Sequence, residues 1–165
     1  MAIKDAFIAE LKHESALTKK MLERVPLEKK VWLPHERSMT VGRLATHIAQ
    51  IPHWISDIIL FPDYDFAARP YLSNTASTSE ELMEIFQQHL DKALQDLDNA
   101  SDELMNQKWT VRRGEHVFSE LVKKVAIRGW GFSHLIHHRG QLSVYLRLLE
   151  VPVPGMYGPS ADEKM

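Results

Sequence analysis

The chain has no cysteine among its 165 residues. This excludes disulfide scaffolds, thiolate-bound zinc and cysteine nucleophiles. An excess of charge of one sign is also missing, because 20 Lys and Arg stand against 22 Asp and Glu, which leaves a net charge of -2. Nucleic-acid binding draws on a concentrated cationic surface, so we expect no nucleic-acid partner.

Long hydrophobic runs are absent as well. No segment approaches the roughly 20 consecutive apolar residues that a membrane-spanning helix needs. The charged start, Met1 to Asp5, does not fit a signal peptide. We therefore expect a cytoplasmic protein without a membrane partner. Hydrophobic residues make up 44% and charged residues 25% of the chain, as in ordinary globular domains.

Apolar residues recur at helical spacing in four long stretches. These stretches cover about 3–25, 40–60, 78–100 and 119–150. Pro26 ends the first, and Pro52 is expected to bend the second or to leave the Ile48 carbonyl unpaired. Thr78 opens the third with a capping-box pattern.

The segments between these stretches complete the predicted fold. Residues 61–76 contain Pro62 and Pro70 and are interpreted as a long crossover loop. Residues 109–118, with a turn at Gly114, form a possible short hairpin before the last helix. The sequence thus predicts an all-α four-helix bundle as a single domain over residues 1–150, followed by a Pro- and Gly-rich tail over 151–165.

Histidine is the residue type that stands out, with nine copies in the chain. Three of them lie close together at His134, His137 and His138. Residues four apart on an α-helix project from the same face, so His134 and His138 should lie side by side. Two imidazoles at this spacing can bind one divalent ion. A pairing of His134 with His137 is the rival arrangement.

The third ligand of such a site would be His47. It lies three residues after Leu44 and four before Ile51, so it should point toward the core of its helix. Three neutral histidines without cysteine favour Zn, Ni, Fe or Mn. Three protein ligands leave positions for water or substrate, as in catalytic sites. The alternative is that these histidines are merely buried and hydrogen-bonded.

Trp130, Gln141 and Tyr145 share the helix face of the paired histidines and are candidates for a substrate pocket. Gln141 could hydrogen-bond a bound water or ligand, whereas Trp130 and Tyr145 suit a pocket wall or the core. Gly129 and other glycines of this helix either permit close helix contact or open space beside the site. No residue is assigned a catalytic role.

Two sequence segments resemble the DinB/YfiT-like family. They are VGRLATHIA at residues 41–49 and HLIHHRGQL at residues 134–142, with further similarity in YLR at 145–147 and PGMYGP at 154–159. The resemblance implies a four-helix bundle, usually a homodimer, that holds a divalent ion by three histidines. Matched by position, these ligands are His47, His134 and His138. Glu150 departs from the family pattern, in which many relatives have a glycine that ends the last helix.

The resemblance also limits the function. Relatives of understood activity are metal-dependent transferases or isomerases that use low-molecular-weight thiols, and others are described as hydrolases. It therefore implies a metal-dependent enzyme acting on a small-molecule substrate, either with a thiol cosubstrate or by hydrolysis. No carboxylate is fixed by spacing to the histidine face, which favours thiol activation or simple metal binding. The alternatives are a non-catalytic metal-binding protein and a helical interaction protein of stress response.

Overall fold

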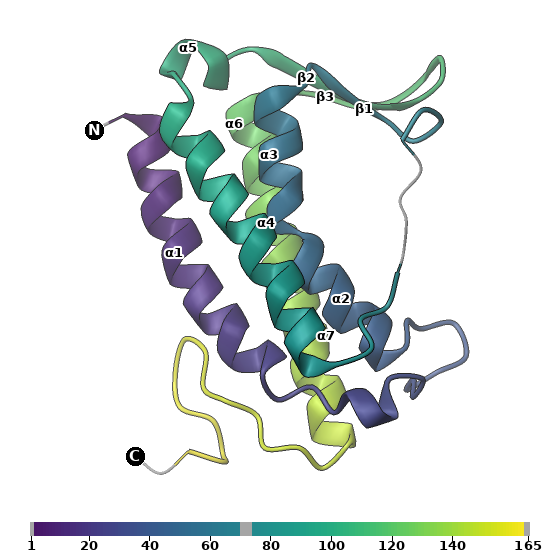
Figure 1. Ribbon diagram of the computed structural model, residues 1–165. Helices are drawn as coiled ribbons and strands as arrows, with labels where there is room; N and C mark the ends of the chain where they lie inside the picture. The colour runs from purple at the N-terminus through teal and green to yellow at the C-terminus, as the bar shows by residue number, and fades with distance from the viewer. Residues whose placement is uncertain (1, 70–73, 164–165) are drawn as a thin grey trace.

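Helices that run side by side make up most of the molecule, and a small sheet covers one end of them (Figure 1). The computed structural model describes residues 2–69 and 74–163. The helices are α1 (Ile3–Leu22), the 3-10 helix η1 (Leu27–Lys29), α2 (Val41–Gln50), α3 (Pro52–Leu60), α4 (Ser79–Asn99), α5 (Asp102–Met105), α6 (Lys123–Ala126), the π-helix η2 (Ile127–Ser133) and α7 (His134–Leu148). The strands are β1 (Asp63–Asp65), β2 (Lys108–Arg113) and β3 (His116–Val122).

The second predicted helix is divided into α2 and α3 at Pro52. Thr40 caps the start of α2, since its Oγ1 accepts a hydrogen bond from the Arg43 amide at 3.2 Å. Pro52 is the first residue of α3, the position where its missing N–H costs least. The Ile48 carbonyl is not left unpaired, because the Ile51 amide donates to it at 3.2 Å. The single helix expected over 40–60 is therefore interrupted between α2 and α3, and the alternative of an unpaired Ile48 carbonyl is wrong.

A mixed sheet in the order β1-β2-β3 makes the all-α four-helix bundle prediction wrong. β1 pairs parallel to β2, with Asp63 opposite Thr110, and β2 pairs antiparallel to β3. β1 lies inside the predicted crossover loop, of which residues 70–73 are outside the described part of the chain. A three-residue strand carries almost no pattern of its own, because its existence depends on backbone pairing with a distant partner.

The hairpin expected over residues 109–118 is present and is longer than expected. It spans 108–122 and turns at Gly114, whose φ of 57° lies in the left-handed region that suits glycine. Residues 119–122, expected to begin the last helix, belong to β3 instead. The pairing of Trp109 with Leu121 and of Lys108 with Val122 gives this stretch its extended form.

The last helical stretch changes its winding along its length. It begins as α6, continues as the π-helix η2 and becomes regular α-helix at His134. A π-helix holds an extra residue per turn, and such segments are frequent at functional sites. The side chains before and after η2 therefore do not follow one continuous α-helical pattern.

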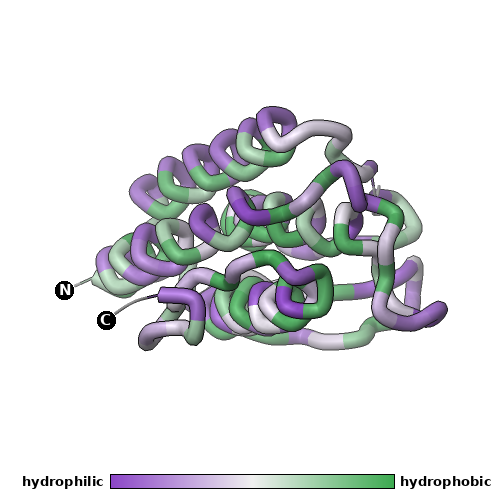
Figure 2. Tube along the Cα trace, turned by 90° about the horizontal axis from the view of Figure 1, so that it is seen from below, coloured by the Kyte–Doolittle hydropathy of each residue, from purple (hydrophilic) through white to green (hydrophobic). Residues whose placement is uncertain are grey.

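Two buried hydrophobic clusters form the core, and hydrophobic positions alternate with hydrophilic ones around each helix (Figure 2). The first cluster includes Leu44, Ile48, Leu82, Phe86 and Leu142. The second lies toward the sheet and includes Leu11, Ile55, Ile58, Trp109 and Phe132. α2 packs against α4 and α7, while α3 packs against α4 and η2. This packing fixes α2 relative to α7, the two helices that carry the candidate ligands.

The C-terminal tail packs back on the helices as far as residue 163. Val151, Val153 and Met156 contact the first cluster, and the Tyr157 hydroxyl donates to Glu14 Oε2 at 2.8 Å. Across the described ranges, no helix combines the length and apolar character needed to cross a membrane.

Candidate metal centre

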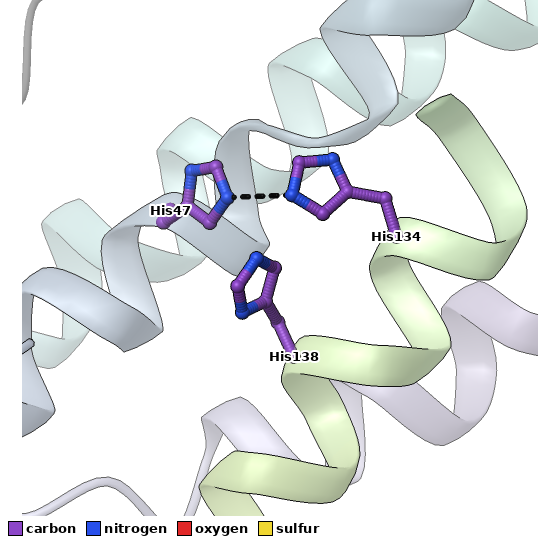
Figure 3. Close-up of side chains that lie close together, drawn as sticks. All are labelled: His47, His134 and His138. Atoms are coloured by element: carbon purple, nitrogen blue, oxygen red, sulfur yellow. Dashed lines mark hydrogen bonds between the residues drawn. The ribbon is translucent and has the colours of Figure 1, made fainter. Parts of the chain in front are cut away.

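Three half-buried histidines from α2 and α7 point toward one another (Figure 3). His47 lies in the last turn of α2, and its neighbours Leu44 and Ile48 are fully buried. His47 lies on the same side of α2 as these two residues, and α2 packs against α7. His134 and His138 come from the first two turns of α7, on one face as their spacing predicts.

The distances suit a single ion. Nε2 of His47 lies 3.1 Å from Nε2 of His134, and one ligand nitrogen from each of the three rings lies within 4.8 Å of the others. Metal–nitrogen bonds of about 2.1 Å at tetrahedral angles place ligand nitrogens about 3.4 Å apart. The first pair has nearly this spacing, and the His138 nitrogen lies within the same 4.8 Å limit.

Burial keeps these imidazoles in the form that binds metal. It lowers the pKa of His47 to about 3, with smaller contributions from His138, His134 and Arg43. It also lowers the pKa of His134 to about 4, where His138 adds to the effect, and it lowers the pKa of His138. All three rings are therefore neutral at pH 7, the state that binds a metal. The 3.1 Å contact between Nε2 of His47 and Nε2 of His134 is a hydrogen bond, so a bound ion would take the place of the proton between them.

Gln141 contacts the ring of His138, one of the candidate ligands. Its Oε1 lies 2.7 Å from Nδ1 of His138. An amide oxygen accepts, so Nδ1 carries the proton and Nε2 is left with its lone pair for an ion. For His134, the Trp130 backbone raises the pKa against the larger effect of burial, and the buried Nδ1 has no hydrogen-bond partner of normal geometry within the described part of the chain.

Trp130 and Tyr145 are separated in the structure. Trp130 lies edge-on to His134, with ring centroids 6.4 Å apart, and lines an open pocket next to it. Tyr145 packs edge-to-face on Trp32 at 5.7 Å and borders the first hydrophobic cluster. Of these two residues, only Trp130 lines this pocket, whereas Tyr145 packs at the edge of the first hydrophobic cluster.

His137 stays outside the three-histidine group. Its side chain is exposed, and its ring centroid lies 4.9 Å from that of His138. The geometry therefore favours the pairing of His134 with His138 over the rival pairing with His137. Sequence reasoning missed the contact of His53 on α3 with His89 on α4, whose ring centroids are 5.1 Å apart. No spacing signal exists for residues on separate helices.

Comparison with known protein families matches the DinB family over residues 1–164. The chain belongs to the DinB family. The membership expected from residues 41–49 and 134–142 is thereby confirmed. The chain is 25% identical over 166 residues to the uncharacterized protein YrdA of Bacillus subtilis (strain 168), covering 96% of this chain and 90% of YrdA.

Two solved structures share the fold of this DinB-family protein. One is a DinB-like protein from Bacillus cereus ATCC 10987, with a TM-score of 0.71 and 21% identity, which covers 93% of this chain and 97% of that one. The other is the DinB-like protein YjoA from Bacillus subtilis, with a TM-score of 0.68 and 15% identity, which covers 96% and 98%. At these identities the likeness establishes the fold.

Proposed function

We propose that this DinB-family protein is a metal-dependent enzyme that acts on a small molecule. The observation that carries the proposal is the convergence of three neutral imidazoles from α2 and α7. Within the described part of the chain, no Asp or Glu joins this group. A site with three protein ligands leaves positions for water or substrate, which is the arrangement of catalytic rather than structural sites.

His47, His134 and His138 would hold the ion. A ligand set of neutral histidines suits Zn, Ni, Fe or Mn. When bound, such an ion supplies Lewis acidity that lowers the pKa of a coordinated water or thiol. The chain's own contribution is to keep the rings neutral by burial and to orient His138 through Gln141.

Between the two reaction types, thiol-dependent transfer is the one we favour, with hydrolysis second. The chain has no cysteine, so a thiol would come from a low-molecular-weight cosubstrate. Hydrolysis would call for a general base, and the histidine group includes no carboxylate to serve as one. A cytoplasmic location and a homodimeric state remain predictions.

The first experiment is a metal analysis of untagged protein purified without chelator. We expect one divalent ion per chain in the native protein and none in His138→Ala. His137→Ala is the matched control, because it removes the adjacent, exposed imidazole that lies outside the group. Equal metal content in both variants, or none in the native protein, would refute the proposed centre.

The second experiment measures turnover of metal-loaded protein with a panel of thiols and electrophiles, and with simple esters and amides. We expect activity that is lost on full chelation and restored by adding the ion. Stoichiometric metal without turnover on either panel would favour the metal-binding protein without catalysis. Activity that survives full chelation would contradict the mechanism.

A further inference from the structure

An open pocket of about 530 Å³ lies beside η2, next to the three-histidine group. Its lining residues are Gly129, Trp130, Ser133, His134 and His137. We call it the Trp130 pocket. His134 belongs both to this lining and to the metal group, so the pocket adjoins the three-histidine group. It is a shallow, wide-open depression, so a ligand bound there would keep one side in contact with solvent.

Two glycines of η2 explain why the space exists. A Cβ on Gly131 would lie 2.8 Å from Cγ1 of Ile55, so at this point η2 packs closely on α3. A Cβ on Gly129 would have no atom of residues 2–69 or 74–163 within 4 Å, so the opposite side of the segment is open. The widened π-helical turn thus contacts α3 on one side and leaves room for a ligand on the other.

The indole of Trp130 is held firmly within this pocket. Its ring centroid lies 5.5 Å from that of Trp54 and 6.3 Å from that of Trp109, and these two residues are only 6% and 1% exposed. Trp130 itself is half-buried. A rigid aromatic side chain can bind another flat ring with little loss of conformational entropy, and aromatic pairs prefer offset or edge-to-face contacts.

The lining also limits the charge of a ligand. None of the five lining residues is Lys, Arg, Asp or Glu, and the surface is largely apolar apart from the Ser133 hydroxyl and the imidazoles. A phosphorylated or strongly ionic group would find no fixed counter-charge among them. The pocket therefore suits the uncharged, flat part of a molecule.

We propose that the Trp130 pocket binds the body of the substrate, and that this body is an uncharged aromatic or similarly flat unsaturated group. The substrate's donor atom would reach the ion held by His47, His134 and His138 while its ring contacts Trp130. This inference rests on the proposed metal centre and adds the class of molecule that the centre acts on.

Two hydroxamates serve as probes, because both bind a metal through the same two oxygen atoms. Acetohydroxamate carries a methyl group, and benzohydroxamate carries an aromatic ring in its place. Their affinities are measured by calorimetry on protein loaded with Co²⁺. We expect benzohydroxamate to bind at least about tenfold more tightly than acetohydroxamate, which corresponds to about 1.4 kcal/mol.

The test variant is Gly129→Leu, which fills the pocket from a position with open space. We expect it to lose the preference for benzohydroxamate while Co²⁺ and acetohydroxamate bind as before. Gly140→Leu is the matched control, since a Cβ there also has no atom within 4 Å but Gly140 lines a different pocket. Trp130→Leu is a second variant with the same expected result, and circular dichroism checks that each variant is folded.

The outcomes separate the two proposals. Failure of the native protein to bind Co²⁺ would refute the metal centre, and with it the pocket's role. Binding of Co²⁺ without binding of either hydroxamate would overturn the pocket assignment alone. Binding of both probes with equal affinity would overturn the pocket assignment alone. So would a preference for benzohydroxamate that persists in folded Gly129→Leu and Trp130→Leu.

Discussion

Arg139 donates from Nη2 to Oε2 of Glu14 at 2.6 Å, and only 2% and 7% of the two side chains are exposed. The pair joins α7 to α1 one residue after His138. Arg139 Nη1 also donates to the Glu14 carbonyl at 3.0 Å and to Thr18 Oγ1 at 3.1 Å, and the Tyr157 hydroxyl donates to Glu14 Oε2. The buried charges are thus paired and hydrogen-bonded, which is the condition under which burial of a charge is tolerated.

Replacing Glu14 with alanine should destabilise the protein strongly. It leaves the buried guanidinium of Arg139 without its counter-charge, and removing one partner of a buried ion pair costs about 3–5 kcal/mol. Urea denaturation measures the change in the free energy of unfolding. The double variant Glu14→Leu with Arg139→Met is the control, since it removes both charges and should cost less. A loss below about 1 kcal/mol in Glu14→Ala would contradict the buried pair.

The stability of the metal-free protein should fall as the pH falls from about 6.5 toward about 3, the interval between the ordinary pKa of histidine and that of His47. In this interval His47 and His134 are protonated in the unfolded chain but stay neutral in the folded protein, because burial lowers their pKa values. The unfolded state therefore binds more protons, and lowering the pH favours unfolding. Urea midpoints measured with chelator present should fall more steeply in the native protein than in His47→Gln. Parallel curves would show that His47 is not buried as a neutral ring.

Gln141→Ala should weaken metal binding without abolishing it. The variant loses the acceptor that fixes the His138 ring, and loss of such outer partners typically lowers metal affinity about 10- to 100-fold. Competition with a chromophoric chelator measures the dissociation constant. Gln141→Glu is the control, because its carboxylate can still accept from Nδ1. Unchanged affinity in Gln141→Ala would remove this role from Gln141.

Lys123→Met should destabilise the sheet end of the protein. The buried Lys123 amine donates to the carbonyls of Ile59 at 2.7 Å and of Phe61 at 3.0 Å. It therefore supplies hydrogen bonds to carbonyl groups at the C-terminal end of α3. Without it these acceptors are left unsatisfied, at a cost of about 1–3 kcal/mol. Hydrogen exchange should increase most around residues 57–61. Lys124→Met is the control, since Lys124 bonds only the exposed side chain of Asn106 among its described contacts.

Much of the candidate site was predictable because its signals are local. The spacing of His134 and His138 fixes their common face, and the stripe of Leu44 and Ile48 fixes the inward direction of His47. Pro52 and the cap at Thr40 likewise act on their immediate neighbours. Convergence of the two helices could not be derived from spacing. The core-facing position of His47 made it the best candidate for the third ligand, and the family resemblance implied the same three histidines.

The features that sequence reasoning missed depend on distant partners. β1 forms because Asp63 and Asp65 meet residues 47 positions later in β2, as in the pairing of Asp63 with Thr110. The contact of His53 with His89 and the bond of Tyr157 to Glu14 join different elements in the same way. Hydrophobic periodicity predicts which face of a single helix or strand is buried, but it does not predict which residues of two separate elements come into contact.

The π-helical winding of η2 has a consequence for insertions and deletions in this family. Such a turn holds about one residue more than an α-helical turn, and the widened backbone accommodates that residue locally, so the segments on either side keep their relative direction. Deleting a single residue within Ile127–Ser133 would restore regular winding with α6 and α7 nearly in place, but it would remove one side chain from the surface beside His134. Homologous chains that are one residue shorter here would therefore surround the ion with different side chains while keeping all three imidazoles.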